Sequence, residues 1–354
     1  MERLILTMPI APYSKFSIGK MSTPILAEAL AKKMGGEFYL AVNLLDSYKN
    51  REISKYKELI EAYDITPDKL WIDNEHINDL IDKLHLLIKQ GYIFSTEKEI
   101  LCCECKKVEI CKDNIKSINM EDSCITYYNG KYYCKNCMQE CKTIIIEVLV
   151  FDPLKIKNKE ICFYPDFINK DIKTFNETVG SNQIVISRLR NTGINITYNS
   201  KNYNIDIDFL WEIYLSLFSQ KEKIVLCSNH QLFQLYMVLM LEKCFDNRTN
   251  TIGLATPFIN TSGNNLENEL EKRILSLKLF TLLNFKWAKK ENIVNSSLIT
   301  YLNSMNVRKK QELYDIIMRK ENNDLLKEDL KKILLCDFNF QNANLILKRS
   351  RKNA

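Results

Sequence analysis

Cysteine is the residue type whose spacing in this chain says most about chemistry. The chain has 354 residues and 12 cysteines, and eight of the cysteines lie between positions 102 and 141. Two residues separate Cys102 from Cys105, and two separate Cys134 from Cys137. This spacing lets both sulfurs of a pair point into one tight turn, and two such turns supply a tetrahedral set of thiolates for Zn²⁺. The spacing therefore predicts a zinc site formed by these four residues.

Two other interpretations of the cysteine segment remain open. One is a cluster of free thiols, which a reactive and unprotected surface disfavours. The other is a second zinc site built from the remaining cysteines of the segment, which are Cys103, Cys111, Cys124 and Cys141. A cytosolic chain that concentrates cysteine in one segment more often binds metal than forms disulfides, so we expect a cytoplasmic protein. Four thiolates leave no open coordination position, so the expected metal is structural.

The composition supports a folded protein with a large core, because 46% of the residues are hydrophobic and 27% are charged. The chain has 50 basic and 44 acidic residues, and the net charge of +6 permits a nucleic-acid partner without requiring one. No run of about 18 apolar residues occurs, so we expect no membrane-spanning helix. The N-terminal stretch lacks the cleavage site of a secretory signal.

The elements that must position the chemical residues alternate between strand and helix in the first part of the chain. Apolar runs and amphipathic spacing predict strands over residues 3–8 and 37–45, and helices over residues 21–34, 51–63 and 76–90. Gly35 and Gly36 end the first of these helices. This order predicts an α/β fold with a right-handed, doubly wound parallel sheet of the Rossmann-like type.

After the cysteine segment the same rhythm is expected to resume. Strands are predicted over residues 144–151, 183–189, 223–227 and 251–259, with helices over residues 206–218 and 230–245. Beyond Gly263 the pattern is wholly helical, over residues 266–290, 294–305, 308–320 and 325–335, followed by a basic tail. We therefore expect two halves of a Rossmann-like domain (residues 1–92 and 183–262), a zinc-bearing insertion (93–182) and a helical C-terminal region (263–354).

The order of these parts resembles the class I aminoacyl-tRNA synthetases, and the methionyl type best. The loop APYSKFSIGK is similar to that class's first signature, Pro-Tyr followed by His-Ile-Gly-His, and it keeps Ile18 and Gly19. GKYYCKNC resembles the zinc knuckle of the methionyl insertion, and VISRLRNTGINI resembles the run that follows it. TPFINTSGNN lies where the Lys-Met-Ser-Lys-Ser loop belongs. The resemblance covers residues 1–290 and depends on order and spacing more than on any single motif.

The resemblance implies a function as well as a fold. It implies ATP-dependent activation of an amino acid, or of a related small carboxylate, with Mg²⁺ accompanying the ATP. The acyl group would then pass to tRNA or to another acceptor such as a carrier protein. The alternative is a catalytically degenerate synthetase paralogue that binds tRNA or a protein partner without chemistry.

Several residues are implied to form the ATP site. They are Pro12, Tyr13, Gly19, Lys20, Asn229, His230 and Ser262. Ser17 and Lys20 replace the signature histidines and are the implied catalytic residues, while the second loop keeps Ser262 but has no lysine. Losing a cationic contact to a transferring phosphoryl group typically costs about 10²–10³-fold in rate. Each residue also has a plain structural interpretation, such as a solvated lysine, a helix-capping serine or a packing histidine.

The implied contacts to the amino acid are Asp46, for the amino group, and Trp211, for the side chain. A capping or solvated aspartate and a core tryptophan are the alternatives. His76 and His85 are predicted to be structural. Arg188 and Arg190 are predicted to contact phosphate or the insertion, or to be surface charges.

Overall fold

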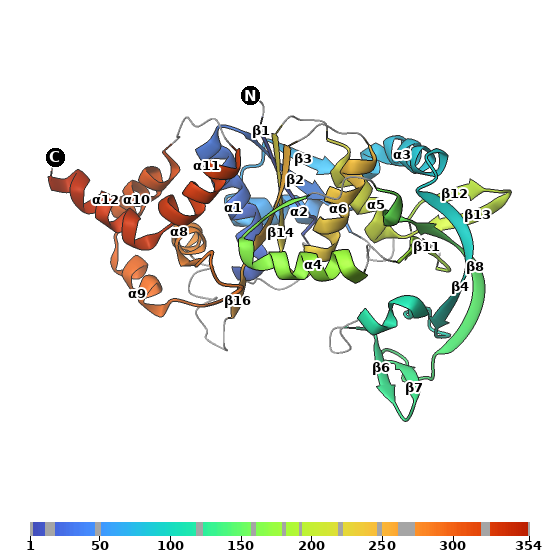
Figure 1. The fold of residues 1–354 in the computed structure, drawn as a ribbon. Helices are drawn as coiled ribbons and strands as arrows, with labels where there is room; N and C mark the ends of the chain where they lie inside the picture. Colours follow the sequence, from blue (N-terminus) through green and yellow to red (C-terminus); the bar gives the residue numbers. More distant parts are fainter. Residues whose placement is uncertain are drawn as a thin grey trace.

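A computed structural model of the chain places a six-stranded sheet at its centre (Figure 1). The structure describes residues 3–10, 18–46, 51–117, 123–156, 161–178, 182–190, 193–218, 222–245, 250–260, 273–319 and 326–352. The sheet has the strand order β3-β2-β1-β14-β15-β9, and every neighbouring pair is parallel. The predicted doubly wound parallel sheet is therefore confirmed.

The strands of the central sheet have the following bounds. They are β1 (Arg3–Thr7), β2 (Glu37–Val42), β3 (Lys69–Ile72), β9 (Cys162–Tyr164), β14 (Glu222–Ser228) and β15 (Asn250–Thr256). From β1 the chain proceeds to β2 and β3 on one side, and β14 and β15 continue on the other. The order therefore reverses between β1 and β14, which is where doubly wound folds leave a crevice outside the carboxyl ends of their strands.

Each strand of this sheet divides its side chains between two hydrophobic cores. In β1, Ile5 joins one core while Leu4 and Leu6 join the other. Val225 and Leu226 of β14 are divided in the same way. Successive residues of a strand point to opposite faces of the sheet. When both faces are covered, the sequence of each strand is therefore a nearly continuous apolar run.

Helices cover both faces of the sheet. In the sheet-forming parts of the chain they are α1 (Ile18–Met34), α2 (Ile53–Ala62), α3 (Ile77–Lys89), α4 (Asn169–Thr178), α5 (Ile207–Ser216) and α6 (Leu232–Cys244). Short helical turns are η2 (Asp73–His76), η3 (Lys112–Ser117), η4 (Pro153–Lys155), η5 (Asp166–Ile168) and η6 (Asn229–Gln231). None of the helices that the structure describes has the length and apolarity needed to cross a membrane.

A long antiparallel ribbon carries the cysteine segment away from the body of the protein (Figure 1). Its strands are β4 (Ile93–Cys102) and β8 (Lys142–Phe151), and they pair along their whole length. Beyond the ribbon lie β5 (Glu109–Cys111), β6 (Ile125–Tyr128) and β7 (Lys131–Cys134). We call residues 103–141 the zinc module.

The segments that flank the ribbon differ from the sequence-based expectation in two respects. First, β9 lies within the range expected for the insertion, 93–182, yet it pairs with β15 in the central sheet. Second, the strand expected over 183–189 is two short strands, β10 (Ile184–Val185) and β11 (Ser187–Arg188), which pair outside that sheet. β11 belongs with the hairpin of β12 (Asn195–Tyr198) and β13 (Lys201–Ile205). The second difference arises from tertiary pairing. Residues 183–189 were correctly predicted to be extended, but they pair with strands outside the central sheet.

The C-terminal region is mostly helical. Its helices are α8 (Ile274–Asn284), α9 (Ser296–Ser304), α10 (Val307–Met318), α11 (Leu326–Lys332), the π-turn η7 (Ile333–Asp337) and α12 (Phe340–Lys352). The expectation of an all-helical region was wrong at one place, because β17 (Glu291–Ile293) pairs in parallel with β16 (Phe258–Asn260). The helix expected to run to residue 290 therefore ends at Asn284.

Buried ion pairs join the helical region to the sheet domain. The carboxylate of Glu28 on α1 lies 3.2 Å from the Lys278 ammonium on α8 and 2.9 Å from Lys32. The Thr66 hydroxyl donates to the same carboxylate at 2.6 Å. Burial alone would raise the pKa of Glu28, but the Thr66 and Lys32 hydrogen bonds and the charge of Lys278 outweigh it and lower the pKa.

Candidate functional site

The carboxyl ends of β1 and β14 lie side by side at the point where the strand order reverses. Thr7 pairs with Leu226, and the Met8 amide donates to the Leu226 carbonyl at 2.7 Å. The side-chain amide of Gln231 then donates to the Pro9 carbonyl at 3.2 Å. The segment that leaves β1 and the segment that follows β14 therefore lie side by side at the carboxyl-terminal end of the strands, which we call the carboxyl edge of the sheet.

Gln231 fixes the turn after β14 and was not foreseen as a site residue. Its side-chain oxygen accepts hydrogen bonds from the Ser228 amide at 3.4 Å and from the Ser228 hydroxyl at 3.2 Å. Serine followed three residues later by glutamine is the signature of a capping box, so the sequence held the signal for this contact. The cap sets the direction in which Asn229 and His230 leave the strand.

Asn229 carries a buried acceptor that no group in the described ranges satisfies. Its Oδ1 atom is inaccessible to solvent and has no hydrogen-bond partner among the described residues. Leaving such a group unsatisfied typically costs about 1–3 kcal/mol, so a ligand hydroxyl or amino group would gain by donating to it. His230 is exposed, and its ring lies perpendicular to Phe258 with the centroids 5.5 Å apart.

The first signature loop is only partly described. Pro12, Tyr13 and Ser17 lie outside the described residues, as does Ser262 of the second loop. Lys20 lies in the first turn of α1, which begins three residues earlier than expected, and its side chain is not among those described.

Gly19 also lies in that first turn, and its surroundings are described. A Cβ atom at Gly19 would have no neighbour within 4 Å among the described atoms, so close packing does not require glycine there. Open space beside the backbone at a helix N-terminus suits the approach of a ligand phosphate.

The carboxyl ends of β2 and β3 add two buried carboxylates to the same edge. The Asp46 amide donates to the Asn43 side-chain oxygen at 3.2 Å, and Asp46 is buried. Asp73, which directly follows β3, accepts from the Leu44 amide at 2.7 Å and from the Leu45 amide at 3.2 Å. Burial raises the pKa of Asp73 to about 6, although these backbone donors oppose the shift. Asp73 was missed because no strand was predicted over residues 69–72, so nothing marked Asp73 as a strand end.

A short chain of contacts links Trp211 on α5 to this carboxylate loop. The Arg51 guanidinium lies 5.4 Å from the centre of the Trp211 ring and donates to the Tyr56 hydroxyl at 3.4 Å. That hydroxyl in turn donates to the Asn43 carbonyl at 3.4 Å. Trp211 Nε1 and Asn43 Nδ2 are both buried, with no hydrogen-bond partner in the part of the chain that the structure describes. The contacts thus connect Trp211 with the loop that carries Asp46.

The zinc module brings four sulfurs together. The Sγ atoms of Cys103, Cys105, Cys134 and Cys137 all lie within 4.8 Å of one another. Cys103 and Cys105 are separated by 3.1 Å, and Cys105 and Cys134 by 3.6 Å. Tetrahedral thiolates about 2.3 Å from Zn²⁺ lie about 3.8 Å apart, so the cluster is the right size for this ion. Four thiolates that enclose an ion leave no position for substrate, which suits a structural metal.

The fourth ligand of the cluster is Cys103 and not the predicted Cys102. Cys102 is the last residue of β4, where it pairs with Lys142, and its sulfur donates to the Lys142 carbonyl at 3.5 Å. Because successive residues of an extended chain point in opposite directions, only one of the two adjacent cysteines can face the cluster. The structure does bring together the other predicted ligands, which are Cys105, Cys134 and Cys137.

The two turns of the cluster have one backbone feature in common and differ in the span of their hydrogen bonds. The residue after each second cysteine, Lys106 or Met138, adopts a left-handed conformation with φ of 57° or 58°. The Lys106 amide donates to the Cys103 carbonyl at 3.0 Å, and the Met138 amide donates to the Cys134 carbonyl at 2.8 Å. The Asn136 amide also donates to the Cys134 sulfur at 3.4 Å.

The thiols of the cluster differ in acidity, because burial and the hydrogen bond with Cys105 raise the pKa of Cys103. The hydrogen bond from Cys103, together with the Lys107 amide, lowers the pKa of Cys105 to about 6. Within the described ranges, no second group of at least three candidate ligands is close enough to share an ion. The possible second zinc site from Cys111, Cys124 and Cys141 therefore has no support there.

Solved structures with a similar fold are methionyl-tRNA synthetases from Mycobacterium tuberculosis. The enzyme in complex with methionyl-adenylate has a TM-score of 0.69 at 10% identity, over 99% of this chain and 83% of that one. This chain has the fold of methionyl-tRNA synthetase. The apo form gives a TM-score of 0.64 at 11% identity, over 99% and 81% of the two chains. A second structure with methionyl-adenylate gives 0.63 at 10% identity, over 90% and 71%.

No family model matches the sequence, and a search of curated proteins gives no match. At 10–11% identity the structural likeness establishes the methionyl-tRNA synthetase fold and leaves the activity to be argued from the site. The predicted class I synthetase type of sheet is therefore confirmed as a fold.

Proposed function

We propose that this protein is a class I aminoacyl-tRNA synthetase-like enzyme. In the proposed reaction the carboxylate of an amino acid, or of a related small acid, attacks the α-phosphate of ATP. An acyl-adenylate forms, pyrophosphate leaves with its Mg²⁺, and the acyl group passes to tRNA or another acceptor such as a carrier protein. The observation that carries the proposal is the polar edge of the sheet between β1 and β14, where Asn229 presents a buried and unpartnered oxygen.

The geometry supports an ATP site at this edge. Gln231 ties the β1 and β14 segments together, while Asn229 leaves an acceptor for a ribose hydroxyl or the adenine amino group. Gly19 leaves room beside the N-terminus of α1, where the helix dipole favours phosphate. Pro12, Tyr13, His230 and Ser262 are proposed to complete the site, on the resemblance alone.

This activation needs no covalent nucleophile, so the protein supplies position and charge. Lys20 is proposed to stabilise the charge that develops on the leaving pyrophosphate, with Ser17 as a hydrogen-bond donor. Asp46 is proposed to bind the substrate amino group and Trp211 to contact its side chain. Arg51 stacks on Trp211 and is proposed to hold it in place.

The fold supports a structural role for Zn²⁺ at Cys103, Cys105, Cys134 and Cys137. These thiolates would enclose the ion at the end of the β4–β8 ribbon, and the cleft residues belong to other elements. The metal would therefore hold the zinc module folded and would take no part in adenylation.

One specific feature favours a second candidate function. The run TPFINTSGNN has no lysine where the resemblance places a lysine-bearing loop, and Ser17 and Lys20 stand where the signature has histidines. Several lost cationic contacts would slow adenylation by orders of magnitude. The second candidate is a catalytically degenerate paralogue that binds tRNA or a protein partner.

ATP–pyrophosphate exchange across a panel of amino acids tests the enzyme against the paralogue. The enzyme predicts exchange that depends on one amino acid and falls about 10²-fold or more in Lys20→Ala. Lys131→Ala is the matched control, because Lys131 is exposed and pairs with Glu140 at 2.7 Å in the zinc module, outside the elements that form the cleft. No exchange with any amino acid, together with measurable tRNA binding, would favour the paralogue.

A further inference from the structure

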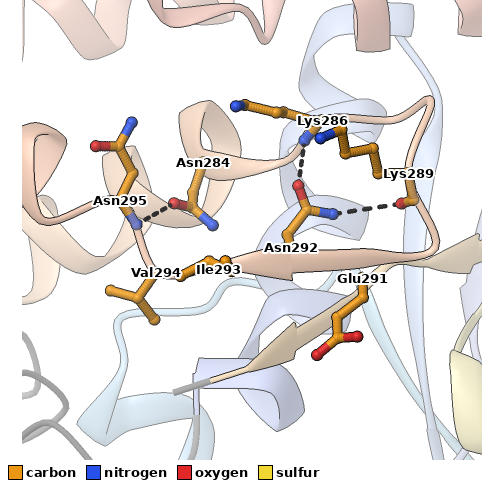
Figure 2. Close-up of a pocket in the computed structure, with 8 residues that line it drawn as sticks. All are labelled: Asn284, Lys286, Lys289, Glu291, Asn292, Ile293, Val294 and Asn295. Carbon is orange, nitrogen blue, oxygen red and sulfur yellow. Dashed lines mark hydrogen bonds between the residues drawn. The ribbon is translucent and has the colours of Figure 1, made fainter. Parts of the chain in front are cut away.

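A second polar cavity lies in the C-terminal region, at the junction of α8, β17 and α9. It has a volume of about 320 Å³ and is lined by Asn284, Lys286, Lys289, Glu291, Asn292, Ile293, Val294 and Asn295 (Figure 2). All of these residues come from one stretch of chain that leaves α8 and enters α9. None of them is among the residues assigned above to the cleft or to the zinc module.

The cavity contains a buried donor that no described side chain or backbone group satisfies. Asn284 is only 5% exposed, and its side-chain oxygen accepts from the Asn295 amide at 3.0 Å. That bond fixes the orientation of the side chain and leaves Nδ2 as the free end (Figure 2). Nδ2 has no hydrogen-bond partner among the residues that the structure describes. A buried donor without a partner among the described residues can be satisfied by an acceptor on a bound ligand.

Two cationic side chains are held beside this donor. Asn292 organises the turn that carries them, because its oxygen accepts from the Lys286 amide at 2.7 Å and its Nδ2 donates to the Lys289 carbonyl at 3.4 Å. Within the described residues, neither lysine forms an ion pair with an acidic side chain. The single carboxylate of the cavity, on Glu291, accepts from Asn260 at 3.0 Å.

The N-terminus of a helix adds to the positive potential. Asn295 caps α9 by accepting from the Leu298 amide at 3.1 Å, and the same residue lines the cavity. The helix dipole and the unsatisfied amides of the first turn favour an anion in such a position. An amide donor, two ammonium groups and a helix N-terminus thus surround one space.

We propose that this cavity binds a phosphate group. A phosphate offers several acceptor oxygens at once, and lysine contacts it as a point charge without a demand for planar geometry. The phosphate is either free, as inorganic phosphate or a phosphomonoester, or part of an RNA backbone. The site is separate from the proposed adenylation cleft and stands whether or not adenylation occurs.

Binding is measured on the full chain without ATP, so that failure of the proposed function cannot affect the result. Inorganic phosphate is titrated by calorimetry, and a fluorescent single-stranded oligoribonucleotide is titrated by anisotropy over a salt series. Asn284→Asp keeps the acceptor for Asn295 and replaces the free donor with a like-charged oxygen. Lys286→Gln combined with Lys289→Gln removes the two charges, and Lys290→Gln is the matched control. Thermal melting shows that each variant is folded.

The expected result is that Asn284→Asp and the double lysine variant each weaken binding at least tenfold, with Lys290→Gln unchanged. If the effect is seen with inorganic phosphate alone, the ligand is a free phosphate. If it is seen with the oligoribonucleotide, the salt slope should fall by about 1.4 in the double variant, at roughly 0.7 per lost contact. Failure of both probes to bind, or binding that none of these variants changes, would overturn the proposal.

Discussion

The structure assigns Cys103, and not its neighbour Cys102, as a zinc ligand. This assignment gives a sharp prediction, because only one of the two adjacent cysteines should be needed for zinc. Cys103→Ser removes one of the four sulfurs that lie within 4.8 Å of one another. Cys102→Ser changes a sulfur that lies outside the four-sulfur cluster and donates to the Lys142 carbonyl in the adjacent strand. We expect Cys103→Ser to lose zinc, and Cys102→Ser to retain one zinc per chain.

The magnitude follows from the small core of the zinc module. Apart from its cysteines, that core contains the buried side chains of Leu101, Val108, Ile115 and Ile125. At roughly 1.5–3 kcal/mol each, these side chains contribute about 6–12 kcal/mol. Structural zinc contributes about 10–16 kcal/mol, as much as the whole apolar core. Loss of the metal should therefore unfold the module.

The assay combines zinc content, measured by mass spectrometry of the purified protein, with limited proteolysis. Cys103→Ser should contain less than a tenth of the wild-type zinc and be cleaved within residues 103–141, and chelation should produce the same cleavage in the wild type. The body of the protein should stay resistant, because β4 and β8 remain paired up to the ribbon's end. Loss of zinc from Cys102→Ser with retention in Cys103→Ser would refute the assignment.

Two further predictions concern buried carboxylates. The pKa of Asp73 is raised to about 6 from 3.8, so its contribution to stability is present below pH 4 and is lost as the pH rises through 6. Relative to Asp73→Asn, the wild type should lose roughly 3 kcal/mol of unfolding free energy between about pH 3 and pH 7, a range that includes both pKa values, and parallel profiles in urea titrations would contradict this. The pKa of Glu28 is lowered, so its contribution is present at neutral pH and is lost as the pH falls through the folded value. Glu28→Gln should destabilise the protein by roughly 1.5–3 kcal/mol at pH 7, because it removes one of the two carboxylates that face the buried Lys278 ammonium and leaves only Asp64, at 3.1 Å. The difference should shrink below pH 4, and a difference independent of pH would argue against the ion pair.

The parts of the fold that could be predicted are those whose residues are buried on both sides. β1 reads as an apolar run because both of its faces meet a core, and α1 reads as a helix because Gly35 and Gly36 end its apolar spacing. β4 could not be predicted in the same way, since most of its central residues are partly exposed and polar. Its strand structure comes from its pairing with β8. Even the nearest paired residues of the two strands, Cys102 and Lys142, are 40 residues apart in the sequence.

The site could be predicted where its chemistry depended on the spacing of residues in the sequence. It was harder to predict where the chemistry depended on the pairing register of strands. The sequence located the cysteine pairs, but the choice between Cys102 and Cys103 depends on the last residue of a strand that only pairing defines. Gln231 was within reach through a capping signature, whereas Asp73 was not, because the short and partly exposed strand β3 before it was not predicted. The contact of Arg51 with Trp211 joins segments 160 residues apart, and no local pattern predicts it.

The central claim is that the edge of the sheet between β1 and β14 binds ATP. Equilibrium binding of ATP with Mg²⁺, compared between the wild type and Asn229→Leu, tests it most directly. We expect the wild type to bind ATP and the variant to bind it at least tenfold more weakly. Thermal melting should show that the variant is folded. If the wild type does not bind ATP, or if the variant binds it equally well, ATP does not bind between β1 and β14 as proposed.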